Sequence, residues 1–185
     1  MQLKEHLLSL GKRARGLNGK PVLFDRPVDL IIIHWIGPYP GHEPAGTRNW
    51  WENGGNGLGV QASAHYIVKG ETVLQCLPLN EVGWHSGDTR NRHSIGIEAI
   101  PMNASGAFAP ATVETLKELV SLIRKTHPGA RLARHYDGAQ KKDCPRYYTP
   151  AMSLFDGGGR VANPEGGEER WVKLRDYLDG KGEEA

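Results

Sequence analysis

The chain has 185 residues, of which 38% are hydrophobic and 24% are charged. This composition is typical of one folded domain that is large enough to bury a core, and it excludes disordered and collagen-like chains. The formal charge of +2 at pH 7 is small, so we expect no nucleic-acid partner. No apolar run approaches the ~20 residues that a membrane helix needs, so we expect no integral membrane association.

The first 21 residues combine leucines with a basic stretch. Leu3, Leu7 and Leu10 recur at helical spacing, which predicts a short amphipathic helix followed by a basic loop. The basic residues follow the leucines, which is the reverse of a secretory signal, so we expect synthesis in the cytoplasm without a signal peptide. The basic loop is either a solvated segment or a contact for an anionic surface.

Residues 29–36 form a continuous run of apolar, mostly β-branched side chains. This pattern predicts a strand that is buried on both faces. Gly37 and Pro38 then require a loop. His34, near the end of this strand, lies where α/β proteins commonly bind ligands. Its two interpretations are a ligand-binding histidine and a hydrogen-bonded core histidine.

Two strand-like runs, residues 62–68 and 72–77, surround a turn and predict a hairpin. His65 lies in the first strand, and the pattern does not decide whether it faces the core or the site. Cys76, in the second strand, is interpreted as a small buried hydrophobic residue.

Aromatic side chains occur in two segments of different character. Residues 47–52 predict a short helix, in which we expect one of Trp50 and Trp51 to pack in the core and the other to line a groove. Residues 81–92 form a polar loop that carries Trp84 and His85.

Residues 94–100 predict another buried strand, in which Glu98 is surrounded by isoleucines. Burying an unpaired carboxylate costs several kcal/mol. Glu98 therefore either forms a structural salt bridge or has a raised pKa that suits it to proton transfer.

The carboxyl-terminal third predicts two helices and a short strand. A helix over residues 110–127 begins at a proline and carries an apolar stripe. Residues 130–134 predict a strand that delivers His135, residues 152–167 predict a glycine-rich loop, and a last helix carries Trp171 and Leu178. We find no boundary to a second domain, so we expect residues 1–185 to form one domain with a core of about 22–180.

The segment RHYDGAQKKDCP places His135 nine positions before Cys144. The adjacent lysines, Lys141 and Lys142, are expected to lower the pKa of the thiol. Two histidines and a cysteine with an open fourth position form a known catalytic zinc arrangement, so a second histidine is needed from elsewhere in the fold. A disulfide between Cys144 and Cys76 is the alternative.

Four segments, taken together, resemble a known family: IIIHWIG, SAHYIVKGETVLQCLPLNEVGWHSGD, RHSIGIEAI and RHYDGAQKKDCP. They span residues 28–148 and are similar to the zinc-dependent N-acetylmuramoyl-L-alanine amidases of type 2, which include phage lysins, autolysins and peptidoglycan recognition proteins. The resemblance implies an α/β fold, with a mixed central sheet of about five strands flanked by helices. It also implies one Zn²⁺ per chain, held by His34, His135 and Cys144.

The resemblance further implies that Glu98 is the catalytic glutamate and that Lys142 stabilises the oxyanion. The loop before Cys144 is one residue longer than the common form, so Lys141 is an alternative to Lys142. A substrate groove is expected along four aromatic or imidazole side chains, namely Trp51, His65, Trp84 and His85.

The function implied is hydrolysis of the amide bond between N-acetylmuramic acid and L-alanine in bacterial peptidoglycan, by an endolysin or autolysin that acts on the wall after release. The sequence shows no separate wall-binding module and does not give the oligomeric state. Two alternatives remain: a non-catalytic muropeptide-binding module, and a cytosolic recycling amidase for anhydro-muropeptides.

Overall fold

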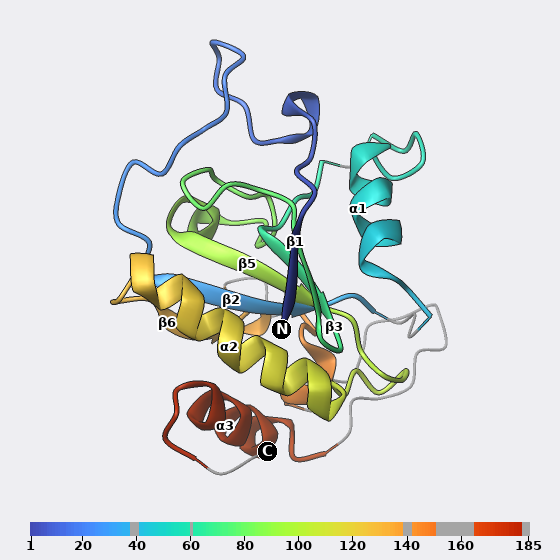
Figure 1. Ribbon diagram of the computed structural model, residues 1–185, viewed down its shortest axis with the longest axis vertical. Helices are drawn as coiled ribbons and strands as arrows, with labels where there is room; N and C mark the ends of the chain where they lie inside the picture. Colours follow the sequence, from blue (N-terminus) through green and yellow to red (C-terminus); the bar gives the residue numbers. More distant parts are fainter. Residues whose placement is uncertain (38–40, 60, 139–141, 151–164, 183–185) are drawn as a thin grey trace.

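The computed structural model describes residues 1–37, 41–59, 61–138, 142–150 and 165–182. These residues form one six-stranded sheet with helices on both sides (Figure 1). The strands are β1 (Gln2–Glu5), β2 (Leu30–Trp35), β3 (Tyr66–Lys69), β4 (Thr72–Gln75), β5 (Ser94–Ala99) and β6 (Arg131–Arg134). The helices are α1 (Pro44–Glu52), α2 (Pro110–Thr126) and α3 (Gly167–Leu178).

The sheet is mixed, as expected, and has six strands where about five were predicted. Its order is β1-β4-β3-β5-β2-β6. Strands β3, β5, β2 and β6 run parallel to one another, and β4 is antiparallel to β3. The antiparallel pair confirms the predicted hairpin. Since four strands are parallel, their carboxyl ends lie along the same edge of the sheet.

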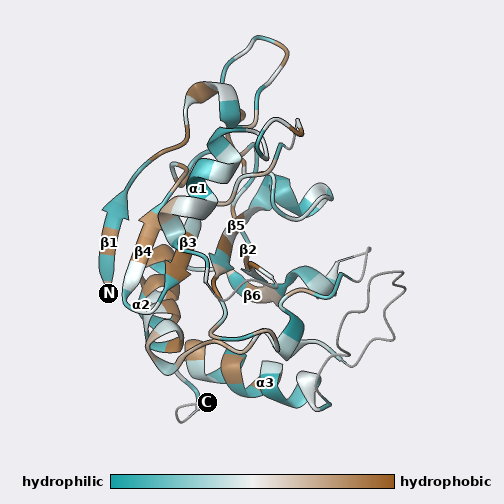
Figure 2. Ribbon diagram, turned by 90° about the vertical axis from the view of Figure 1, so that its right-hand side faces the viewer, coloured by the Kyte–Doolittle hydropathy of each residue, from teal (hydrophilic) through white to brown (hydrophobic). Residues whose placement is uncertain are grey.

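The two faces of the sheet are covered differently. On one face, β2 and β5 contribute Ile31, Ile33, Ile95 and Ile97 to the main core, which is closed by α2 and α3. The other face carries a smaller core that includes Ile67 and packs against α1. Figure 2 shows hydrophobic residues on β3, β4 and α2, whereas β1 at the outer edge is mostly hydrophilic. Because Ile31 and Ile33 of β2 point into the main core and side chains alternate along a strand, His34 points to the opposite face of the sheet.

The apolar stripe of α2 is entirely buried, as the 3.6-residue period requires. The helix begins at Pro110, whose fixed φ suits the first turn, and it ends at Thr126, two residues before Pro128. The predicted glycine-rich loop at 152–167 lies almost wholly outside the described residues. Among the described residues, no helix has the length and apolarity needed to cross a membrane.

The predicted N-terminal helix is wrong. Gln2–Glu5 instead form the edge strand β1, which pairs with β4 in parallel, and Leu10–Lys12 form only a 3₁₀ turn. A helix of this length is marginal in water, and the free edge of β4 offers unpaired backbone groups that an extended segment can satisfy. Leu8 is fully buried in the smaller core, which anchors the segment.

A candidate metal centre beside a buried glutamate

Three chemically distinctive side chains meet at the carboxyl edge of the parallel strands. His34 on β2 and Glu98 on β5 are direct partners in the parallel register, so both point to the same face. His135 follows the last residue of β6, which pairs with β2 on its other side. Strand register therefore places residues from positions 34, 98 and 135 side by side.

His34, His135 and Cys144 form a group whose ligand atoms all lie within 4.8 Å of one another. The Nδ1 atoms of the two histidines are 3.1 Å apart. Cys144 Sγ lies 3.6 Å from His34 Nδ1. Tetrahedral coordination of zinc implies N–N separations of about 3.3 Å and N–S separations of about 3.6 Å. The spacing of the donor atoms thus fits one small cation.

Hydrogen bonds set the tautomer of His34. The Arg90 carbonyl can only accept, so Ser94 Oγ donates its proton to it over 2.6 Å. The Ser94 oxygen then accepts from His85 Nε2 at 3.4 Å, which leaves His85 Nδ1 unprotonated. That atom lies 3.0 Å from His34 Nε2 and accepts its proton. His34 Nδ1 therefore presents a lone pair to the centre.

His135 is oriented in the same way. Its Nε2 donates to the Ser86 carbonyl at 2.9 Å, so its Nδ1 also carries a lone pair. Two unprotonated nitrogens 3.1 Å apart cannot hydrogen-bond to each other and repel. A cation between them removes this repulsion, and partners that fix the outer nitrogen of a ligating histidine are typical of metal sites. The donor set and its surroundings fit a metal ion.

Burial keeps these imidazoles neutral. The pKa of His34 is lowered well below its usual value by burial, with additional repulsion from His85 and His135. Burial, reinforced by the charge of Lys142, lowers the pKa of His135 to about 4. Neutral imidazole is the form that binds metal.

Arg90 holds the backbone that carries His135. Its guanidinium donates to the carbonyls of Arg134 and His135, at 3.1 and 3.0 Å, and is itself paired with Asp88. Gly138 allows this approach, because a Cβ there would lie 1.9 Å from the Arg90 side chain. The 81–92 loop is thereby tied to the end of β6.

Cys144 is buried and free, as is Cys76, which excludes the disulfide between them. Its segment is fastened at both sides: Tyr136 N donates to the Cys144 carbonyl at 2.8 Å, and Trp35 Nε1 donates to the Asp143 carbonyl at 3.0 Å. The expected lowering of the thiol pKa is wrong for the metal-free chain. Burial, with repulsion from the Glu98 carboxylate, raises the pKa of Cys144 well above its usual range, and the opposing effect of Lys142 is smaller.

Glu98 lies at the edge of the centre. Its Oε1 is 4.0 Å from His34 Nδ1, and its side chain is 16% exposed. Burial raises the pKa of Glu98 to about 8. This shift agrees with the interpretation of Glu98 as a proton-transfer group and argues against a strong structural salt bridge.

Lys142 is exposed, and its positive charge acts to lower the pKa values of His34, His135 and Cys144. It therefore lies near the centre, although no hydrogen bond within the described residues fixes its ammonium group. Lys141 falls outside the described residues.

The four predicted groove residues separate into two groups. Trp51 lines a cavity of about 790 Å³ that also reaches Glu98, and the half-exposed Trp84 lines a second cavity that shares Trp51. His65 does not line a groove: it is fully buried, its Nε2 donates to the Glu81 carbonyl, and its Nδ1 accepts from Gly96 N. His85 is also buried, and it lies behind His34.

Sequence reasoning missed the supporting groups of the centre, namely Ser94, Arg90 and Gly96. A Cβ on Gly96 would lie 2.5 Å from the His85 ring, so the glycine makes room for that ring. The available signal was a glycine inside a buried strand, which often marks a close approach of another group.

The fold and this centre together define an α/β domain with a metal-binding donor set beside a buried carboxylate. The family model described as N-acetylmuramoyl-L-alanine amidase matches residues 24–147. The chain belongs to this family, and the resemblance noted from the sequence is confirmed.

Similar proteins agree with this assignment. The chain is 30% identical over 146 residues to N-acetylmuramoyl-L-alanine amidase XlyA of Bacillus subtilis, and the match covers 77% of this chain and 48% of that protein. It therefore spans about half the length of this relative.

Two solved structures show the same fold. A mutant endolysin from Bacillus subtilis superposes with a TM-score of 0.60 at 27% identity, covering 79% of this chain and 90% of that one. The PlyG catalytic domain gives a TM-score of 0.68 over 98% of this chain and 95% of that one, and at 16% identity it supports the fold alone.

Proposed function

We propose that this chain hydrolyses the amide bond between N-acetylmuramic acid and L-alanine in bacterial peptidoglycan, using one zinc ion bound by His34, His135 and Cys144. The observation that carries this proposal is the convergence of three donor atoms beside a buried glutamate: the two Nδ1 atoms are 3.1 Å apart, and Cys144 Sγ is 3.6 Å from His34 Nδ1. Family membership supplies the reaction class. The cellular role that we propose is lysis of the cell wall, as an endolysin or autolysin.

The cavity beside Glu98 provides room for the scissile amide. It measures about 790 Å³ and is lined by Trp35, Trp50, Trp51 and Glu98. This volume lies within the range of ordinary ligand sites, and its aromatic lining suits the methylene and sugar faces of a muropeptide. A zinc ion held by His34, His135 and Cys144 would supply Lewis acidity, which would lower the pKa of bound water and polarise a carbonyl.

Side chains of the protein carry out the proton transfers and stabilise the developing charge. Glu98, once ionised, accepts a proton at its carboxylate from the attacking water and then delivers it to the leaving amine. The pKa of about 8 in the metal-free chain falls when a divalent cation binds nearby, which makes the carboxylate available near neutral pH. We assign to Lys142 the stabilisation of negative charge on the carbonyl oxygen, a contact whose loss typically costs about 3–4 kcal/mol of activation free energy.

The test separates metal binding from catalysis. Glu98→Gln should retain about one zinc per chain by elemental analysis but release no new amino-terminal alanine from purified wall, as followed by mass spectrometry. Glu169→Gln, an exposed position on α3, is the matched control and should cleave like the wild type. Cleavage by the Glu98 variant at the wild-type rate would overturn the assigned role, and an absence of bound zinc in the wild type would overturn the metal assignment.

A further inference from the structure

A second cavity lies next to the one that reaches Glu98. It measures about 390 Å³ and shares Trp51 and Ala62 with its neighbour. Its other wall is the segment 11–15, which precedes the residues matched by the family model. The two cavities are therefore adjacent, and the second one is built partly by a segment that lies before the residues matched by the family model.

Positive charge gathers in this cavity. Lys12, Arg13 and Arg15 line it, and no carboxylate of the described residues does so. Arg13 has a structural role, since its guanidinium pairs with Glu81 at 3.1 Å and its Nε donates to the Leu8 carbonyl. These contacts hold the segment against the domain.

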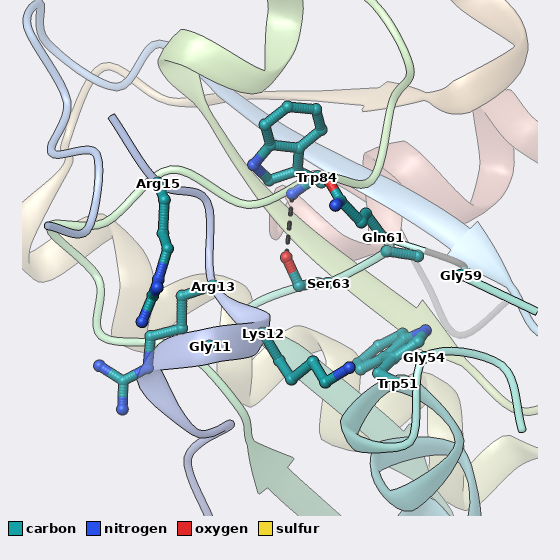
Figure 3. A pocket seen from close by; sticks show the side chains of 11 residues that line it. Gly11, Lys12, Arg13, Arg15, Trp51, Gly54, Gly59, Gln61, Ser63 and Trp84 are labelled. Atoms are coloured by element: carbon teal, nitrogen blue, oxygen red, sulfur yellow. Dashed lines mark hydrogen bonds between the residues drawn. The ribbon is translucent and has the colours of Figure 1, made fainter. Parts of the chain in front are cut away.

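The other two cations are available to a ligand. Arg15 is exposed, and its Nε donates to the Leu10 carbonyl, while its terminal guanidinium nitrogens have no hydrogen-bond partner in the described part of the chain. Lys12 is exposed as well, and Figure 3 shows its side chain extending toward Trp51. The Glu52 carboxylate interacts electrostatically with Lys12, but it already forms an ion pair with Arg48 and accepts a hydrogen bond from the Ser9 amide.

The remaining wall suits an organic ligand rather than a bare ion. Trp84 is 46% exposed and lies across the cavity from Lys12 (Figure 3). Its backbone amide donates to Ser63 Oγ at 3.1 Å, which fixes the loop that carries it. An exposed indole beside free cations is suited to a group that has both an apolar face and an anionic end.

We propose that this cavity is a subsite for a free carboxylate of the peptidoglycan stem peptide, bound by Lys12 and Arg15 against Trp84. The inference rests on the proposed function, because the subsite lies next to the cavity at Glu98, with Trp51 lining both. The glycan part of such a substrate has only neutral hydroxyl and amide groups to offer to Lys12 and Arg15, whereas the stem peptide carries carboxylates. The subsite thus selects peptides whose carboxylates are free over those that are amidated.

The test compares two soluble muropeptides that differ only in whether the stem carboxylates are free or amidated. In the double variant Lys12→Gln/Arg15→Gln, KM for the free-acid substrate should rise about tenfold, because two charge-assisted contacts are lost, while kcat stays within about twofold. KM for the amidated substrate should not change. Lys125→Gln/Arg131→Gln removes the same charge from exposed positions and is the matched control.

Calorimetric binding of the free-acid muropeptide to zinc-loaded wild type and double variant gives an independent readout. If the wild type binds it and the double variant binds it about tenfold more weakly, the subsite stands even when no cleavage is seen, and only the proposed function fails. Equal binding by both proteins, or an equal loss for free and amidated substrates, overturns the subsite. Competition by inorganic phosphate that exceeds competition by acetate would assign the cavity to phosphate groups and would also overturn it.

Each single variant is measured too, and circular dichroism verifies folding. Both side chains are exposed, so unchanged thermal unfolding is expected. If the double variant unfolds, the two single variants decide the question, because each should raise KM for the free-acid substrate about threefold. The preference for the free acid should also weaken as salt is raised.

Discussion

The raised pKa of Glu98 makes a quantitative prediction about stability. In the metal-free chain its pKa is about 8, against 4.5 for an unperturbed glutamate, because the carboxyl group is buried. The folded state therefore holds this proton more tightly than the unfolded chain does. The resulting stabilisation is complete below pH 4.5 and is lost as the pH rises through 8. Glu98→Gln cannot ionise, so it lacks this dependence.

The size of the effect follows from the two pKa values. As the pH rises from about 5 to about 8.5, linkage predicts that the free energy of unfolding of the wild type falls by about 4 kcal/mol relative to that of the variant. Groups that are common to both proteins cancel in the difference. The assay is urea unfolding of both proteins in the presence of a chelator, at several pH values.

Two further observations decide the interpretation. If the stabilities of wild type and variant run parallel within about 1 kcal/mol over this range, the carboxyl group is not desolvated and the reasoning is refuted. With zinc present the pH dependence should shrink, because a nearby cation stabilises the carboxylate.

Three other substitutions test the supporting structure. His85→Ala removes the acceptor that orients His34 and should weaken zinc affinity about 10–100-fold, as measured by competition with a chromogenic chelator; an affinity within twofold of wild type would contradict the tautomer assignment. Gly96→Ala places a Cβ 2.5 Å from the His85 ring and should lower both zinc affinity and the melting temperature, whereas Gly46→Ala, with nothing within 4 Å, should lower neither. Leu119→Ala, at a fully buried position of α2, should cost about 2–5 kcal/mol of stability in urea unfolding without changing zinc stoichiometry.

The sequence predicted the sheet, the hairpin and the long helix because their patterns are local. A β-branched run and a 3.6-residue stripe each describe burial within a few consecutive residues. The N-terminal leucines show the limit of this reasoning. Their spacing favoured a helix, but the unpaired edge of β4 stabilised a strand, and that edge belongs to a segment 70 residues further along the chain.

In the candidate centre, too, the sequence identified the residues but not all of their surroundings. The sequence indicated His34, His135, Cys144 and Glu98 as special, since each interrupts an apolar pattern or belongs to a segment that resembles the family. The strand pattern did not decide which way His65 faces, because a period of two identifies opposite faces but not which face is open. The resemblance led us to expect His65 in the groove, whereas the structure buries it in the core.

The sequence by itself determined which residue types were present for metal binding and proton transfer, and that His34 and His135 lie near strand ends. Only the tertiary structure decided their geometry. The register of β2 with β5 pairs His34 with Glu98, and the contacts of Arg90 and Trp35 bring His135 and Cys144 to them. The physical reason is that hydrogen-bond direction and donor spacing depend on contacts between segments 50 to 110 residues apart, which no local pattern encodes.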